Sequence, residues 1–408
     1  MTEVFDLSAG RKAQDHAGTD LWTRLLLRLA RHVRCGAIRL TLPGGQTLQV
    51  SGERAGPQAE LTIRRPRFAR RLLLGGATGV GAAYIDGDFQ TPDLAALVEW
   101  AASNEDLARS ALQAVPPLRL AGRALHALRR NSRRGSRRNI AFHYDLGNAF
   151  YAQWLDPTMT YSAACFDSPR DDLQAAQLNK YRRIAEMAGL QPGDRVLEIG
   201  TGWGGFACFA AREFGARVTT VTISAAQADY AAARVQEEGL GDRVEVALRD
   251  YRDVTGSYDR IVSIEMLEAV GADYWPVFFG RLHGLLVPGG VAALQSILIE
   301  DRHYPAYSRR QDFIQRYIFP GGMLPCPSAL QRETARAGLR LTGDERFGAD
   351  YAQTLRLWRQ RFLDAWPAIE RQGFDSRFRR MWEFYLAYCE GGFRSGRIDV
   401  AHLRLQKD

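Results

Sequence analysis

The feature that most constrains this chain is the stretch over residues 194–206, in which a short apolar run leads directly into three glycines. Val196, Leu197 and Ile199 are typical of a buried parallel strand. The residues after the glycines, 206–212, predict a helix. A strand that ends in glycines and opens a helix lets a ligand approach bare backbone. We therefore expect a ligand site at the carboxyl end of this strand.

The residue types around the glycines narrow the choice of ligand. The spacing of the glycines, G-x-G-x-G, also fits a dinucleotide site, and taken alone it is weak evidence for any particular ligand. Glu198 stands just before the first glycine, Gly200. A carboxylate there repels a pyrophosphate and suits a cation, which favours S-adenosylmethionine, with its sulfonium and amino groups, over NAD. The alternative is a glycine turn with a purely structural role.

Length, hydropathy and cysteines limit the class of protein. The 408 residues are enough for two or three domains. No stretch reaches the length of a membrane span, and the first residues lack the basic and apolar regions of a secretion signal. The five cysteines are scattered, odd in number and without a CxxC pair, so we expect a reducing cytoplasm and no metal site.

The positive charge is unevenly placed. The net charge is +8, and residues 1–138 carry 22 Lys and Arg against 12 Asp and Glu. Such asymmetry suggests a polyanionic partner, either nucleic acid or an anionic membrane surface. The alternative is a solvated surface rich in arginine.

The first third of the chain predicts a small α+β domain over residues 1–114, followed by an Arg-rich linker over residues 115–138. The linker has no interleaved aromatic residues for base stacking and no nucleic-acid fold signature follows it, so we favour docking on anionic phospholipid and expect no nucleic-acid partner. The expected elements are a basic amphipathic helix over residues 19–34, strands over 37–43, 47–50 and 60–64 with a hairpin at the two glycines 44–45, and helices over 68–74 and 93–103.

From residue 139 onward, strands and helices alternate, which predicts a parallel α/β sheet. The expected strands cover residues 195–199, 217–223, 244–248, 258–264 and 290–297. Ligands of such sheets lie beyond the carboxyl ends of the strands. The polar or aromatic residues that fall there are Glu198, Thr222, Gln227, Tyr251, Arg252, Glu265, Glu268 and Gln295.

Several segments together resemble the cyclopropane-fatty-acyl-phospholipid synthase family of S-adenosylmethionine-dependent methyltransferases. They are residues 142–148, 155–162, 197–205, 221–227, 263–271, 317–322, 347–351 and 388–394, with a looser match at 83–89. The resemblance implies an α/β protein: a Rossmann-like class I methyltransferase sheet with helices on both faces over residues 139–408, plus a smaller N-terminal α+β lipid-binding domain.

The resemblance also implies an activity. A methyl(ene) carbon would pass from S-adenosylmethionine to the double bond of an unsaturated acyl chain of a membrane phospholipid, and a bound bicarbonate would take a proton so that a cyclopropane ring closes. The implied partners are these acyl chains, the anionic inner face of the membrane as a peripheral surface, and a second copy as a homodimer. The alternatives are a methyl-branched or methylene product, a methylated conjugated diene, and an inactive lipid-binding protein.

Site residues are carried over position by position. The cofactor set is Tyr161, Ser162, Glu198, Gly200, Gly202, Trp203, Gly204, Thr222, Gln227, Tyr251 and Arg252. Glu268 and Tyr351 match positions around bicarbonate, and Cys389 matches a cysteine regarded as active, although a buried structural cysteine is the alternative. Tyr317 and Phe142 would face the substrate cation with their ring electrons, with core packing as the equal alternative.

Two positions of the implied bicarbonate pocket depart from the family pattern. A cysteine is replaced by Ala163, and a histidine by Gln295. Alanine has no polar side chain, and glutamine hydrogen-bonds but does not titrate near neutrality. Bicarbonate would then bind differently or not at all, and the cation could resolve to a branched or methylene chain instead of a ring.

Overall fold

The computed structural model describes residues 4–6, 20–104 and 146–408, and the chain forms two compact units. The α+β unit comprises Met1–Leu128, Arg309–Arg316 and Glu370–Arg397, and the sheet unit comprises Arg129–Ser308, Tyr317–Ile369 and Ile398–Asp408. The predicted Arg-rich linker and Phe142 lie outside the described residues. Within those residues, no helix is long and apolar enough to cross a membrane.

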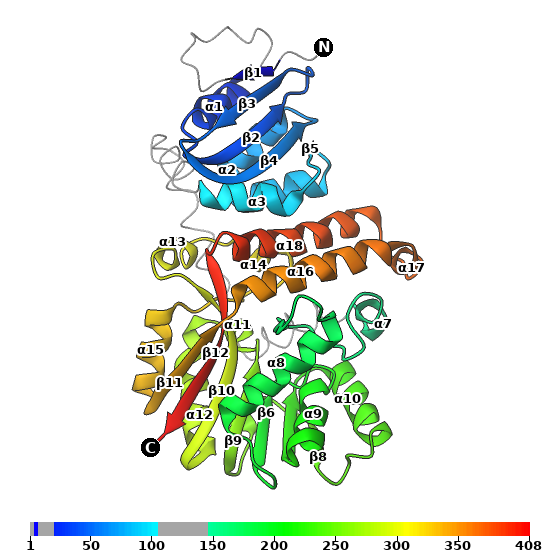
Figure 1. Ribbon diagram of the computed structural model, residues 1–408, viewed down its shortest axis with the longest axis vertical. Helices are drawn as coiled ribbons and strands as arrows, with labels where there is room; N and C mark the ends of the chain where they lie inside the picture. The colour runs from blue at the N-terminus through cyan, green and yellow to red at the C-terminus, as the bar shows by residue number, and fades with distance from the viewer. Residues whose placement is uncertain (1–3, 7–19, 105–145) are drawn as a thin grey trace. The chain divides into compact units, whose positions relative to one another are not determined.

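The α+β unit contains a five-stranded sheet in the order β1-β3-β2-β4-β5 (Figure 1). The predicted hairpin is confirmed, because β2 and β3 pair antiparallel from Ala37↔Ser51 to Thr41↔Thr47. Strand β4 pairs parallel with β2 and is longer than predicted. The strands are β1 (Val4–Asp6), β2 (Cys35–Thr41), β3 (Thr47–Ser51), β4 (Arg54–Ile63) and β5 (Phe89–Gln90).

The longer helices that the structure describes in this unit are α1 (Leu21–Ala30), α2 (Arg67–Ile85), α3 (Leu94–Ser103) and α18 (Ser376–Arg394). The basic helix α1 begins at Asp20, whose carboxylate accepts the Trp22 and Thr23 amides. Helix α18 packs against α3 although more than 270 residues separate them. Their approach is close, since a Cβ on Gly391 would lie 2.7 Å from the Val98 Cβ.

A buried carboxylate holds α2 to the turn that follows it. Asp88 is fully buried and accepts hydrogen bonds of 2.8 Å from both Arg67 Nε and Arg71 Nη1. The turn before it needs Gly87, whose φ is +71°. These residues belong to the loosely matching stretch 83–89, so that stretch has a clear structural role.

The sheet unit is built on seven strands in the order β11-β12-β10-β9-β6-β7-β8. The five predicted strands are confirmed and run parallel to one another: β6 (Arg195–Ile199), β7 (Arg217–Thr222), β8 (Val244–Leu248), β9 (Tyr258–Ile264) and β10 (Leu286–Ile299). Two antiparallel strands were not predicted, β11 (Leu339–Arg346) and β12 (Ile398–Lys407). Figure 1 shows β12 between β10 and β11.

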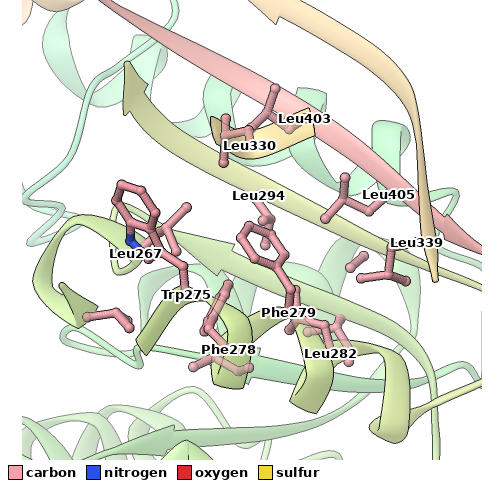
Figure 2. Close-up of a cluster of buried hydrophobic side chains, with 14 of the residues drawn as sticks. Leu267, Trp275, Phe278, Phe279, Leu282, Leu294, Leu330, Leu339, Leu403 and Leu405 are labelled. Carbon is pink, nitrogen blue, oxygen red and sulfur yellow. The ribbon is translucent and has the colours of Figure 1, made fainter. Parts of the chain in front are cut away.

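Both faces of this sheet are buried, which explains the continuous apolar runs. Successive side chains of a strand point to opposite faces of the sheet. In β6, Val196 packs in a first core and Leu197 in a second core. Figure 2 shows the second core, where Phe278 and Phe279 of α12 (Trp275–Leu285) pack with residues of β10, β11, β12 and α15 (Pro327–Arg336). Helices α8 (Leu173–Ala188) and α9 (Gly205–Phe214) contribute to the first core.

Further helices lie along the described part of the chain. They are α7 (Asn148–Tyr151), α10 (Ala225–Glu237), α11 (Leu267–Val270), α13 (Tyr304–Tyr307), α14 (Phe313–Tyr317), α16 (Gly348–Asp364) and α17 (Trp366–Glu370), with 3₁₀ turns η2 (Tyr251–Asp253) and η3 (Ala272–Tyr274). Two of them contribute to the two cores, α10 with Val235 and α11 with Leu267.

Candidate active site

The glycine loop after β6 has the backbone shape that the sequence predicted. Gly200, Gly202 and Gly204 have φ values of +101°, +54° and +81°, which favour glycine over residues with a Cβ. Gly204 is also the N-cap of α9, and a Cβ there would lie 3.1 Å from the Ala231 Cβ. The loop therefore presents bare backbone at the carboxyl end of β6, as a nucleoside ligand requires.

Glu198 lies at the end of the same strand and is 2% exposed. Among the described residues, its carboxylate accepts one hydrogen bond, of 2.6 Å, from Thr220 Oγ1. Burial raises the pKa of Glu198 to about 8. A buried acid with so few partners suits a cationic ligand, so the residues present fit the methionine end of S-adenosylmethionine.

Four residues of the predicted cofactor set lie at or after the ends of β7 and β8, namely Thr222, Gln227, Tyr251 and Arg252. Thr222 Oγ1 donates to Gln227 Oε1 at 3.2 Å. The Arg252 guanidinium forms two hydrogen bonds with Asp250, of 2.8 and 2.6 Å, and its carbon lies 5.7 Å from the centroid of the Tyr251 ring. Arg252 is therefore neutralised by its own neighbour and positions the Tyr251 ring.

An aromatic group supports the predicted residues of the segment before the sheet. The Tyr161 ring centroid lies 5.2 Å from that of Trp358 and 5.3 Å from that of Tyr151. Tyr151 also packs against Trp203, at 5.0 Å, and Trp203 Nε1 donates to Asn148 Oδ1 at 2.8 Å. Two predicted cofactor residues, Tyr161 and Trp203, are thus brought together through a residue that was not predicted.

Two predicted catalytic residues, Gln295 and Tyr351, meet at a carboxylate that follows β9, that of Glu265. Glu265 Oε1 accepts the Ala163 amide at 2.8 Å and Gln295 Nε2 at 2.7 Å. Its other oxygen, Oε2, accepts the Tyr351 hydroxyl at 2.6 Å. Glu265 has a φ of +49°, which is unusual for a residue other than glycine.

Gln295 connects this carboxylate to a histidine that sequence reasoning missed. Gln295 Oε1 lies 2.9 Å from His402 Nε2, and since an amide oxygen only accepts, the histidine donates. The two residues are directly opposite in the register of β10 and β12. Burial, with the charges of Lys180 and Arg183, lowers the pKa of His402 to about 3, so this histidine is neutral near pH 7.

Glu268 lies one turn beyond Glu265. One of its oxygens accepts Ser296 Oγ at 2.9 Å and the Ile297 amide. Its Oε2 is buried without a hydrogen-bond partner among the described residues. Burial and the charge of Glu265 raise the pKa of Glu268 to about 8, so it keeps its proton at pH 7.

Lys180 is a second residue that the sequence did not reveal. It lies on α8, is fully buried, and its Nζ donates to Ser162 Oγ at 2.7 Å. Burial lowers the pKa of Lys180 to about 8, and the nearby charges of Glu265 and Glu198 act against this. A single lysine in an amphipathic helix normally faces solvent, so its spacing gave no signal.

The other two predicted catalytic residues are Tyr317 and Cys389. Tyr317 is half-buried at the end of α14. Cys389 is half-buried on α18, which belongs to the α+β unit, whereas Glu265, Glu268, Gln295 and Tyr351 belong to the sheet unit. Within the described residues, no group of His, Cys, Asp and Glu could hold a metal ion.

Comparison with known proteins identifies the family. The model of the mycolic acid cyclopropane synthetase family matches residues 131–403. The chain belongs to this family. The predicted resemblance and fold class are therefore confirmed, and the protein is an S-adenosylmethionine-dependent methyltransferase.

Relatives of the synthetase family cover most of the chain. It is 42% identical over 404 residues to a tuberculostearic acid methyltransferase of Mycobacterium tuberculosis, covering 94% of this chain and 90% of the relative. It is 35% identical to the cyclopropane-fatty-acyl-phospholipid synthase of Escherichia coli, covering 84% and 86%. The crystal structure of the mycolic acid cyclopropane synthase CmaA1 with SAH and CTAB is 32% identical, with a TM-score of 0.62, covering 66% of this chain and 98% of that one.

Proposed function

We propose that this enzyme methylates the double bond of an unsaturated acyl chain in a membrane phospholipid and yields a methyl- or methylene-branched chain. The observation that carries the proposal is the pair of buried acids, Glu265 and Glu268, at the end of β9, next to the strand that bears the glycine loop. An alkene needs no base before it attacks, but the cation it becomes must lose a proton afterwards.

The chain's own residues have separate parts in this reaction. S-adenosylmethionine supplies an electrophilic methyl group. The glycine loop and Glu198 would hold its methionine end, and the aromatic group around Tyr161 would close the site against water. Because an alkene is a weak nucleophile, holding it in line with the methyl contributes much of the catalysis. Methyl transfer leaves a cation on the acyl chain, and a carboxylate at the end of β9 removes the proton.

Which proton is lost decides the product. With the cation on the neighbouring carbon, loss of a proton from the new methyl group closes a cyclopropane ring, and loss from a chain carbon gives a methyl-branched alkene. If a hydride first shifts so that the cation lies on the methyl-bearing carbon, loss of a proton from the methyl group gives a methylene branch. The relative named as a tuberculostearic acid methyltransferase, together with Ala163 and Gln295, favours the branched product. The relative named as a cyclopropane-fatty-acyl-phospholipid synthase supports the ring as the second candidate.

The α+β unit would bring the enzyme to the anionic inner face of the membrane, and a homodimer is part of the proposal. Arg24, Arg28 and Arg31 on or just after α1 are exposed. Leu21 beside them is 61% exposed, so the helix offers basic and apolar groups to a lipid surface.

The test is mass spectrometry of lipids after incubation of the protein with S-adenosylmethionine and liposomes of monounsaturated phosphatidylglycerol. A gain of one CH₂ unit, absent with saturated lipid, supports the proposal. Fragmentation then separates a ring from a branch. No gain with any unsaturated lipid, while S-adenosylhomocysteine still binds, would contradict it and favour the inactive lipid-binding protein.

A further inference from the structure

The residues that the family pattern places around bicarbonate enclose a side chain of this protein. Tyr351, Gln295 and the backbone of Ala163 all donate to Glu265. Building on the proposed function, we propose that the Glu265 carboxylate takes the place of bicarbonate and itself removes the proton that completes the reaction.

The groups that donate hydrogen bonds to Glu265 are not available to bind a second anion. A carboxylate accepts about four hydrogen bonds, and Glu265 already receives three, from a backbone amide, an amide side chain and a hydroxyl. These are the groups that would otherwise bind bicarbonate. The replaced positions fit this arrangement: Gln295 offers an N–H without a charge, and Ala163 contributes only its backbone.

Charge also opposes bicarbonate. Glu265 and Glu268 are both buried, and Glu265 already raises the pKa of Glu268. Lys180 is the buried cation whose charge acts on Glu265. Because Glu268 keeps its proton, a bicarbonate ion would lie beside the Glu265 carboxylate in a site of low dielectric constant and would compete with it for the charge of Lys180. The residues present therefore do not fit bicarbonate as a bound cofactor.

The backbone conformation of Glu265 also indicates that this side chain is functional. A φ of +49° outside glycine is strained and persists only where the surroundings fix it. Here the Glu265 amide donates to the Gln295 carbonyl at 2.8 Å, while the side chain receives its three donors. Strain of this kind gathers at functional sites.

The two acids have different roles: Glu265 acts as the base, and Glu268 stays protonated. Burial raises the pKa of Glu265, and its three donors and the charge of Lys180 act against this and favour the ionised form. Glu268, with an oxygen that has no partner in the described part of the chain, keeps a proton. In the proposed step, a C–H bond beside the cation breaks, its electron pair forms the C=C bond of the branched product, and the proton passes to Glu265. The carboxylic acid then loses this proton to solvent before the next turnover.

Occupancy is tested without lipid, by line broadening of ¹³C-bicarbonate in NMR. The wild type should leave the signal sharp. Glu265→Gly, which relieves the strained φ and empties the pocket, should broaden it. Broadening by the wild type that S-adenosylhomocysteine does not abolish would overturn the inference, and so would a sharp signal with a folded Glu265→Gly protein. Melting and S-adenosylhomocysteine binding establish folding.

The role as base is tested by lipid methylation in CO₂-free buffer, with and without added bicarbonate. The wild type should not respond. Glu265→Gln should lose about 10²- to 10⁴-fold in rate, and Glu265→Gly should be equally slow but recover at least tenfold with bicarbonate. The exposed Glu237→Gln is the matched control. A wild-type rate that falls tenfold without bicarbonate, or full activity of Glu265→Gln, would overturn the inference. If no lipid is methylated by any form, the proposed function fails, and the NMR result still decides which group fills the pocket.

Discussion

Replacing Glu198 with glutamine should stabilise the ligand-free protein at high pH. Glu198 is 2% exposed, and its pKa in the folded protein is about 8, against 4.5 for an ordinary glutamate. Because the folded-state pKa is the higher one, the carboxyl contributes stability below pH 4.5, and that contribution is lost as the pH rises through 8. At about 1.4 kcal/mol per pH unit, full ionisation costs up to about 5 kcal/mol.

The assay is thermal denaturation of wild type and Glu198→Gln at pH 5, 7 and 9. Between pH 5 and pH 9, the free energy of unfolding of the variant should rise by about 4 kcal/mol relative to that of the wild type. This corresponds to a relative rise of roughly 10 °C in Tm for a unit of this size. Comparing the two proteins cancels the titration of groups that they share, except Lys180, whose charge acts on Glu198.

Ligand binding supplies the second half of this prediction. A sulfonium beside Glu198 favours the ionised carboxylate, so wild-type protein should release a proton on binding S-adenosylmethionine near pH 7, measured by calorimetry in buffers of different ionisation enthalpy. Glu198→Gln should bind S-adenosylmethionine more weakly and release fewer protons on binding. The exposed Glu237→Gln serves as the control. A stability difference that does not change with pH, or that changes in the opposite direction, would refute the reasoning.

Three further predictions concern other parts of the molecule. Asp88→Asn should lower the free energy of unfolding by about 2–3 kcal/mol, less than for a wholly buried pair because its arginines reach solvent; a melting curve followed by circular dichroism checks this. Cys389→Ser should methylate lipid at a rate within a few-fold of wild type, because the proposed reaction needs no thiol; a tenfold loss would contradict this. Lys180→Met should move the acid limb of the pH–rate profile to higher pH, because a cation that favours ionised Glu265 is gone. An unchanged profile would speak against that coupling.

The sequence was sufficient for the parallel part of the sheet. Its strands are continuous apolar runs, bounded by glycines or polar residues, and they are buried on both faces. Strand β11 was missed because it is mostly exposed and carries few apolar residues. Strand β12 was missed because Ala401 and the buried His402 interrupt its alternation of apolar and polar residues.

The same distinction applies to the site. Glu198, Glu268 and Gln295 could be predicted because they stand at the carboxyl ends of strands that the sequence reveals. Lys180 and His402 could not be predicted, because their roles depend on burial and on the register of distant elements. Glu265 was placed at the correct edge, but only its three donors distinguish it from an exposed carboxylate.

The packing of α18 on α3 ties together the evolution of two distant parts of the gene. The family model matches residues 131–403, which include α18, whereas α3 precedes that match. Gly391 leaves space for Val98 and the Ala95 carbonyl, so a larger residue at 391 requires a smaller one at 98. Positions 98 and 391 should therefore covary among full-length relatives. A chimera that exchanges residues 20–104 alone would separate two surfaces that selection has fitted to each other.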